Sequence, residues 1–435
     1  MYVSSRNPKP SRLFVPVLAA ALALAAVVQA RAEEAYRLSP TEAVVALAAA
    51  LPSAPADPSA GQLLSAAILF SGANAPRAEK ALAAGLRAVQ AAEALAAETP
   101  DAYERGARVL ELVYGILKRY ELLESRIDSG LLEGRYNCVG SASLYAILAR
   151  AAGLAVRGVI LDDHAYCYLI IDGRRIDVET TDPQGYDNAM EGRKTAPSRD
   201  ASASGVMALV LRNRATLEER SGRWGNALGL AVDAYAYDPG ELTLETLSGR
   251  VNNSVGALLR SGRYDDSLAL ADLAIARYGQ SPAFLELQNT ARLAVLTDRL
   301  RKSVPSEALA MAEEALASGV ADEPWVESAF IWAYTGLAEE RRRAGDHLGA
   351  WEIASTAVSR FSDSRDLASL ERTARANWIK AVHNRFAALY NAGDYEEALA
   401  SLRAARELAP DERILIEDLK AAEAALAASA AATGP

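Results

Sequence analysis

Three residues near the middle of the chain have the side chains that cysteine nucleophilic catalysis requires. Cys138 is followed by small and apolar residues at helical spacing, His164 opens an apolar run, and Glu179 lies in the polar run that comes next. In such chemistry a thiol attacks a carbonyl carbon, a histidine takes and returns the proton, and a carboxylate orients the imidazole ring. The segment 137–181 is therefore the candidate catalytic region.

The thiol stands at the predicted start of a helix. Apolar residues recur at helical spacing from Leu144 to Ala151, and Gly153 is typical of a helix end. Cys138 would then lie at the helix N-terminus, where free N–H groups and the helix dipole favour a thiolate and stabilise an oxyanion. Asn137 is predicted to cap this helix, and donation from its amide to an oxyanion is the second choice.

The histidine and the carboxylates lie on the two strands of a predicted hairpin. Residues 164–171 are rich in aromatic and β-branched side chains, and residues 174–181 alternate between polar and apolar side chains. Asp172-Gly173 between them is the signal for a two-residue type I′ turn, which fixes how the two strands pair.

This pairing ranks the two candidate carboxylates. With a two-residue turn, His164 lies opposite Thr181, and Glu179 is displaced by two residues on the same face, which its long side chain can cross. Asp177 is displaced by four residues, roughly 13 Å along the strand, and has a shorter side chain. We therefore expect Glu179 to orient the imidazole, with Asp177 as the fallback if a bulge shifts the pairing.

The pattern around these residues resembles the transglutaminase-like superfamily, which shares a papain-like catalytic logic. In that family a cysteine opens a helix with small residues, leucines and an arginine, and a turn, a His-Ala-aromatic strand and a hairpin follow. The matching positions are Cys138, Ala142, Leu144, Arg150, Gly153, Arg157, His164, Ala165, Tyr166 and the run from Gly173 to Thr181. Glu179 stands where the family usually has aspartate, and Ala155 stands where it usually has proline. The resemblance covers about residues 130–185, and it implies an α+β core with Cys138 as nucleophile, His164 as base and Glu179 as the orienting acid.

The first 32 residues have the pattern of a secretory signal. Basic residues precede an alanine-rich apolar stretch at 13–28, and Ala30-Arg31-Ala32 is a small-residue cleavage site. Cleavage after Ala32 would release the mature protein into the periplasm or outside the cell, and retention as an uncleaved anchor is the alternative. Alternation along the strand at 164–171 places Cys167 on the face opposite His164, so we expect no disulfide with Cys138.

The charge and composition limit the classes of partner. Without the four basic residues of the signal, the chain has 42 lysines and arginines and 56 acidic residues, which gives a net charge of −14. Such a surface disfavours nucleic acid, and we expect no membrane insertion after cleavage. With three histidines and no cysteine cluster, we also expect no metal and no cofactor. The oligomeric state is not determined by the sequence.

The remaining chain is predicted to be mostly helical. Residues 33–125 are expected to form helices that pack on a core at 126–214, the longest of them at about Ala102–Arg126. Residues 186–204 lack any period and are expected to be a linker, with a flap over the site as the alternative.

From 215 to 435 the chain repeats. Glycine turns at Gly222, Gly262, Gly345 and Gly393 are each followed by regularly spaced alanines, and a weaker copy begins at Pro305. These positions resemble the tetratricopeptide repeat, although the spacing exceeds its 34-residue period. The resemblance implies an all-α solenoid that binds a protein or peptide.

Two functions are therefore expected as alternatives. The first is a secreted cysteine-dependent hydrolase or transferase that acts on protein or peptide amides through a thioester and recruits its substrate with the repeats. The second is a non-catalytic protein–protein interaction scaffold, in which the repeats bind and the transglutaminase-like domain is degenerate. Peptide amides of the cell envelope are a third and weaker possibility for the substrate.

Overall fold

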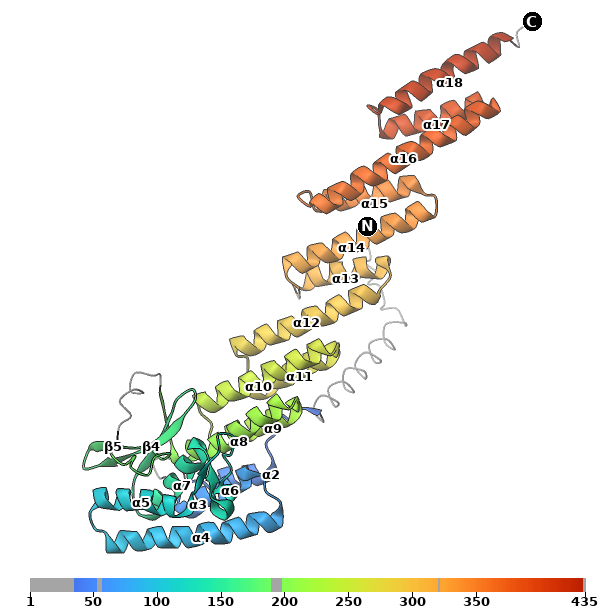
Figure 1. The fold of residues 1–435 in the computed structure, drawn as a ribbon. Coiled ribbons are helices and arrows are strands. Elements are labelled where there is room, and N and C mark those ends of the chain that lie inside the picture. Colours follow the sequence, from blue (N-terminus) through green and yellow to red (C-terminus); the bar gives the residue numbers. More distant parts are fainter. Residues whose placement is uncertain (1–34, 53–56, 189–197, 320, 433–435) are drawn as a thin grey trace, which may run out of the picture. The chain divides into compact units, whose positions relative to one another are not determined.

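The computed structural model describes residues 35–52, 57–188, 198–319 and 321–432 (Figure 1). The predicted signal at 1–32 lies outside these residues. The chain divides into two compact units, Met1–Ala291 and Arg292–Pro435. The expected boundary between core and repeats, at 214/215, falls inside a continuous helix, α8 (Ala203–Arg220).

The described residues are mostly helical, with two small sheets. The helices that precede or contain the candidate thiol are α2 (Glu42–Ala50), α3 (Ala60–Ser71), α4 (Ala75–Glu98), α5 (Ala102–Ile116), α6 (Ile127–Glu133) and α7 (Cys138–Ala151). Helix α7 is buried along nearly its whole length, and α3, α4, α5 and α8 pack around it. One apolar core therefore fixes the helix that carries the thiol.

The expected long helix at Ala102–Arg126 is not formed. Helix α5 ends at Ile116 because Leu117 is extended, and the chain then enters strand β1 (Arg119–Tyr120). This strand pairs in parallel with β2 (Arg135–Tyr136), directly before the thiol. The longest helix before the site is α4, with 24 residues.

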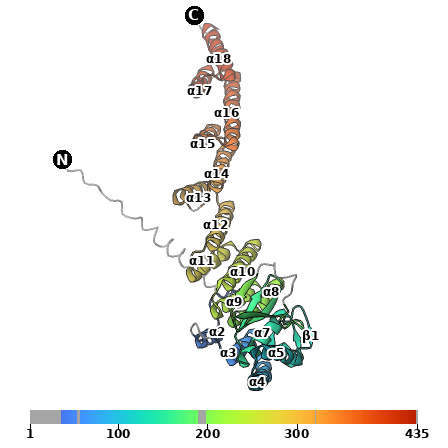
Figure 2. The same cartoon turned by 90° about the vertical axis from the view of Figure 1, so that its left-hand side faces the viewer.

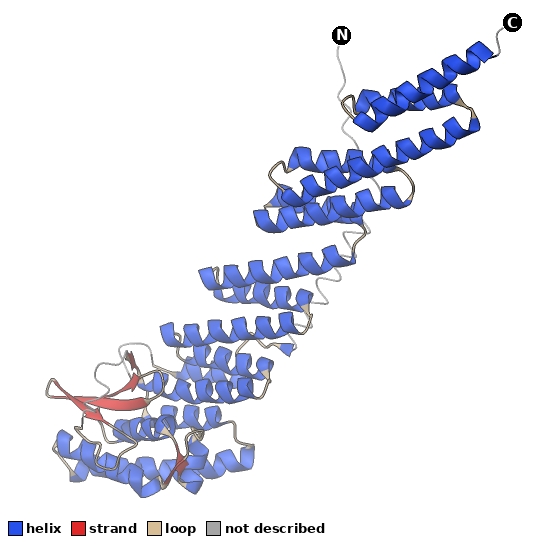
Figure 3. Ribbon diagram, turned by 45° about the horizontal axis from the view of Figure 1, so that its top comes forward, coloured by secondary structure: helices blue, strands red, loops and turns tan. Residues whose placement is uncertain are grey.

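The main sheet is antiparallel and has the order β5-β4-β3-β6. Its strands are drawn in red in Figure 3. Its strands are β3 (Val156–Ile160), β4 (Ala165–Ile171), β5 (Arg174–Val178) and β6 (Arg199–Ala201). Its buried side chains face α7 and include Cys167, Leu169 and Ile176. The sheet thus carries the histidine strand on the same core as the thiol helix.

The predicted hairpin forms over residues 165–171 and 174–178, but the expected pairing of His164 with Thr181 is not part of its ladder. Asp172 and Gly173 have φ values of 49° and 77°, as a type I′ turn requires, and Ile171 pairs with Arg174. The ladder ends where Cys167 pairs with Val178, so the acidic residue that follows leaves the strand.

The expectation of an unstructured linker at 186–204 is wrong for its end. Residues Arg199–Ala201 form the edge strand β6, which pairs with β3. Ser202 then caps α8 by accepting a hydrogen bond from the Gly205 N–H. Residues 189–197 lie outside the described part of the chain.

The rest of the first unit consists of helical hairpins. After α8 come α9 (Trp224–Tyr237), α10 (Glu241–Arg260) and α11 (Tyr264–Tyr278), and α12 (Pro282–Lys302) contains the division between the units. The turn glycines Gly222 and Gly262 both have φ of 72°, the left-handed conformation that glycine adopts without strain. The alanine pattern marks the packed face, since Ala227, Ala231 and Ala234 are buried.

The second unit repeats this arrangement (Figure 2). Its helices are α13 (Pro305–Ser318), α14 (Glu323–Arg343), α15 (His347–Arg360), α16 (Arg365–Ala392), α17 (Tyr395–Leu408) and α18 (Arg413–Ala432). The alanines at 350, 354 and 357 are again the buried face of their helix. Within the described residues, the model has no helix that combines the length and the apolar character needed to span a membrane.

Candidate active site

Asn137 fixes the start of the helix that carries the thiol. Its Oδ1 accepts hydrogen bonds from the Val139 and Gly140 N–H groups at 3.0 and 3.1 Å, and its Nδ2 donates to the Leu122 carbonyl at 3.0 Å. The amide therefore caps the helix, as expected, and its polar atoms are engaged. The Cys138 N–H forms no hydrogen bond with the described residues, so it is the backbone donor left beside the thiol.

His164 and Glu179 form the closest polar pair of the site. The ring Nε2 of His164 lies 2.8 Å from Glu179 Oε2, and the two side chains are 8% and 5% exposed. The second carboxylate oxygen, Oε1, accepts hydrogen bonds from the Thr181 N–H and hydroxyl at 2.9 and 2.5 Å. Both oxygens are thus held, which fixes the plane of the imidazole.

Asp177, the fallback carboxylate, has a different partner. It accepts a hydrogen bond from Arg175 Nε at 2.8 Å and lies opposite Tyr168 in the ladder. Arg175 also stacks on the Tyr168 ring, 4.0 Å from its centroid. The geometry therefore places Glu179, and not Asp177, against His164.

The electrostatics of the site favour a protonated imidazole. Burial lowers the pKa of His164, but the neighbouring Cys138 thiol and the hydrogen-bonded Glu179 carboxylate outweigh burial and raise the pKa to about 9. Burial raises the pKa of Glu179, yet its hydrogen bonds with His164 and Thr181 leave the pKa below the ordinary value. Since Glu179 occupies Nε2, the other ring nitrogen, Nδ1, is the one available to Cys138.

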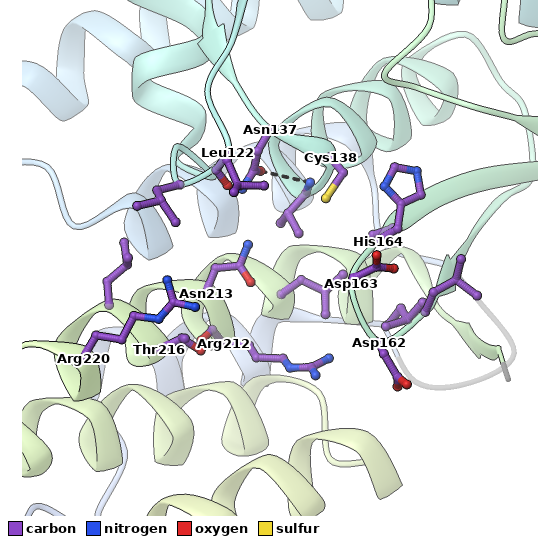
Figure 4. A pocket seen from close by; sticks show the side chains of 17 residues that line it. Leu122, Asn137, Cys138, Asp162, Asp163, His164, Arg212, Asn213, Thr216 and Arg220 are labelled. Carbon is purple, nitrogen blue, oxygen red and sulfur yellow. Dashed lines mark hydrogen bonds between the residues drawn. The ribbon is translucent and has the colours of Figure 1, made fainter. Parts of the chain in front are cut away.

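A cavity of about 300 Å³ opens beside the thiol (Figure 4). Cys138 and His164 line one side, and the exposed Leu122 and Leu123 lie at the rim. The opposite side is formed by α8, which contributes the polar residues Arg212, Asn213, Thr216 and Arg220. A substrate carbonyl entering this cavity would therefore meet the thiol between an apolar rim and a polar helix.

The α8 wall was not expected from the sequence. Its residues lie more than 70 positions after the thiol, at the predicted junction between core and repeats. A signal was present, because Arg212, Thr216 and Arg220 recur every four residues and so share one helix face. Nothing in that spacing indicated which element this face would meet.

The second thiol is separate from the site. Cys167 is fully buried on β4, its Sγ donates to the Ala142 carbonyl at 3.4 Å, and burial raises its pKa far above the ordinary range. Both cysteines are free. Tyr166, on the site face of the same strand, stacks beside the His164 ring with centroids 6.3 Å apart.

The other two histidines lie in the second unit. His347 is the first residue of α15, and the Nδ1 of His383 lies 2.7 Å from Asp418 Oδ2. Among the described residues, no three histidine, cysteine or acidic side chains are grouped so that they could hold a metal ion.

Comparison with known proteins adds no relative. No protein-family model matches the chain, and no curated protein matches it either.

Proposed function

We propose that this chain is a transglutaminase-like cysteine enzyme that cleaves or transfers protein or peptide amides through a thioester. The observation that carries the proposal is the buried Glu179–His164–Cys138 arrangement at the wall of a cavity. An acid that fixes a histidine, and a histidine that lines the same cavity as a thiol at a helix start, are the parts of an activated nucleophile. The proposed setting is the periplasm or the cell exterior.

Each of the three residues has its own role in the proposed reaction. The Cys138 thiolate attacks the amide carbonyl carbon, and the protonated His164 gives its proton to the departing amine as the C–N bond breaks. Water or an amine then attacks the thioester, His164 takes the proton, and the thiolate leaves. Glu179 keeps the imidazolium charged and oriented, which is why burial alone does not neutralise the ring.

The oxyanion formed during attack needs donors near the thiol. The Cys138 N–H lies at the helix start, and it has no competing acceptor among the described residues. Backbone N–H groups held by a rigid helix stabilise developing charge without reorganising. Asn137 supports this role by holding the helix start in place.

The helical hairpins are proposed to be tetratricopeptide-like repeats that form a solenoid and recruit the polypeptide substrate. Two observations support this assignment: glycine turns with positive φ join the paired helices, and small residues are buried where those helices meet. Hydrolysis is favoured over transfer because water is the abundant acceptor.

Acetylation by p-nitrophenyl acetate tests the proposal. The wild-type protein should release p-nitrophenol in a burst and carry an acetyl thioester on Cys138, located by peptide mass spectrometry. Cys138→Ala should lose the burst, and His164→Gln should lose it while retaining the thiol. A glycine ester added during turnover would form its N-acetyl derivative only if the enzyme also transfers acyl groups.

The outcome also decides between the two candidate functions. If Cys138 is not acetylated while the folded wild-type protein is exposed to the ester, the enzymatic proposal fails. The chain would then be a binding scaffold whose repeats carry the function. The burial of Cys138, which is 9% exposed, is the observation that favours this second function.

A further inference from the structure

The cavity at the thiol continues along α8. Two neighbouring cavities of about 380 and 420 Å³ share the lining residues Ile160 and Arg212 with it. All three lie within the first unit beside the end of β3 and helix α8, and the two neighbouring cavities also reach α10. Arg212 therefore stands at the border between the cavity beside Cys138 and two further cavities, and together they offer room for a peptide.

Arg212 differs from the other arginines of this groove. Arg199 is paired with Glu245, and Arg250 is paired with Glu219. The half-buried Arg212 guanidinium has no hydrogen-bond or ion-pair partner among the described residues, and the adjacent Asn213 amide has none either. Both side chains line the cavity that contains Cys138 (Figure 4).

The surroundings leave the charge of Arg212 under-compensated. Burial lowers the pKa of Arg212, Arg250 and Arg199 lower it further, and Glu245 and Asp162 oppose them. An arginine remains charged under such conditions, so a bound anion would restore the balance. A guanidinium by itself offers two parallel N–H donors, which suit the two oxygens of a carboxylate, and the Asn213 amide lines the same cavity as a further donor.

The charges around the groove favour a singly charged anion. Arg220 also lines the cavity from α8, whereas Asp162 and Asp163 line it from the loop before His164. These two acids would repel a dianion such as a phosphate more strongly than a single carboxylate. A peptide supplies a single carboxylate at an acidic side chain or at its C-terminus.

We propose that Arg212, with Asn213 beside it, binds a carboxylate of the peptide substrate, so that the enzyme selects acidic peptides or peptide C-termini. This inference rests on the proposed function, since it names the substrate class of the same site. Arg212 is a binding residue that selects substrate, and it takes no part in proton transfer.

Matched alkylating probes test this inference without a known substrate. Iodoacetate, N-iodoacetylglycine and N-iodoacetyldiglycine would each be compared with its own carboxamide, and the rate of Cys138 labelling read by mass spectrometry. The two members of a pair differ only in the charged carboxylate. We expect the acid-to-amide rate ratio to peak at the probe length that reaches Arg212, at roughly tenfold above the ratio measured with a free thiol.

Variants of Arg212 show whether this residue causes the peak in the acid-to-amide rate ratio. Arg212→Gln should abolish the peak, and Arg212→Lys should keep part of it, because lysine retains the charge and loses the planar fork. Arg87→Gln, which removes an exposed arginine on α4, should leave the peak unchanged. Cys167 should remain unlabelled in every variant, which confirms that the first unit is folded.

The outcomes separate the two proposals. If the carboxamides label Cys138 rapidly but the ratio shows no peak, or shows a peak that survives Arg212→Gln, the substrate class is wrong and the nucleophile stands. If neither member of any pair labels Cys138 faster than a free thiol at neutral pH, the proposed function itself fails.

Discussion

Each compact unit contains one histidine in a short hydrogen bond with a carboxylate. In the first unit His164 lies 2.8 Å from Glu179, and in the second unit His383 lies 2.7 Å from Asp418. The first histidine is 8% exposed and lines a cavity together with a thiol, whereas the second is 39% exposed and lies beside the Phe386 ring.

The comparison shows that a histidine–carboxylate pair does not by itself define a site. What distinguishes the first pair is burial on both partners and a cavity that the histidine lines together with a thiol. Both cysteines of the chain also belong to the first unit. The second pair joins two helices, α16 and α18.

The largest difference between the two pairs should be their effect on thiol reactivity. At pH 6.5 an ordinary thiol with a pKa of about 8.5 is roughly 1% thiolate, so losing the imidazolium partner should slow alkylation of Cys138 by up to about 100-fold. We therefore expect His164→Gln to show that loss with iodoacetamide, and His383→Gln to stay within about twofold of wild type. Equal rates in wild type and His164→Gln would remove the distinction between the pairs.

The next effect concerns the choice of carboxylate. Glu179→Gln should lower the pKa of His164 from about 9 toward the ordinary 6.5, because a neutral amide does not hold the imidazolium. Cys138 alkylation at neutral pH should then fall roughly tenfold. Asp177→Asn is the matched control, since Asp177 contacts Arg175 and not the ring. An NMR titration of the His164 ring measures the pKa directly, and a larger shift in Asp177→Asn would reverse the assignment.

The contact between His164 and Glu179 has a partly local origin. The Asp172-Gly173 turn sets the strand pairing as far as Cys167 and Val178, and Glu179 then reaches His164 from just beyond the end of the ladder. The turn glycines and buried alanines of the helical hairpins are also local signals, since each hairpin packs mainly on itself and on neighbouring helices.

The α8 wall and the edge strand β6 depend on contacts that no local pattern records. Arg212 becomes part of the cavity only because α8 packs on α3 and α7, far away in sequence. The polar segment before α8 has no alternation, yet Arg199–Ala201 becomes a strand because β3 offers an open edge. Tertiary packing determines whether such an element forms and what it contacts, and it also determines where the first unit ends.

A smaller effect is the dependence of stability on pH. The raised pKa of His164 means that the folded chain holds this proton more tightly than the unfolded chain. Its contribution is therefore complete below about pH 6.5 and is lost as the pH rises through about 9, a change on the order of 3 kcal/mol. The lowered pKa of Glu179 sets the other limit, because its contribution is complete above about pH 4.5 and is lost at lower pH.

Pulsed labelling of Cys167 in urea measures this dependence, because that thiol is fully buried until the first unit unfolds. Between pH 6 and pH 10 the free energy of unfolding should decline more in wild type than in His164→Gln. Parallel declines in the two proteins would show that the ring is not charged in the folded state.

The smallest expected effect is the stability cost of breaking the second pair. His383 is more than one-third exposed, so water screens its interaction with Asp418, and His383→Gln should cost about 0–1 kcal/mol. The fluorescence of the stacked Trp351 and Trp378 reports unfolding of the second unit, because their rings lie 4.7 Å apart within it. If instead His383→Gln destabilises its unit as much as His164→Gln destabilises the first, burial is not what separates the two pairs. The thiol and the cavity alone would then mark His164 as the functional histidine.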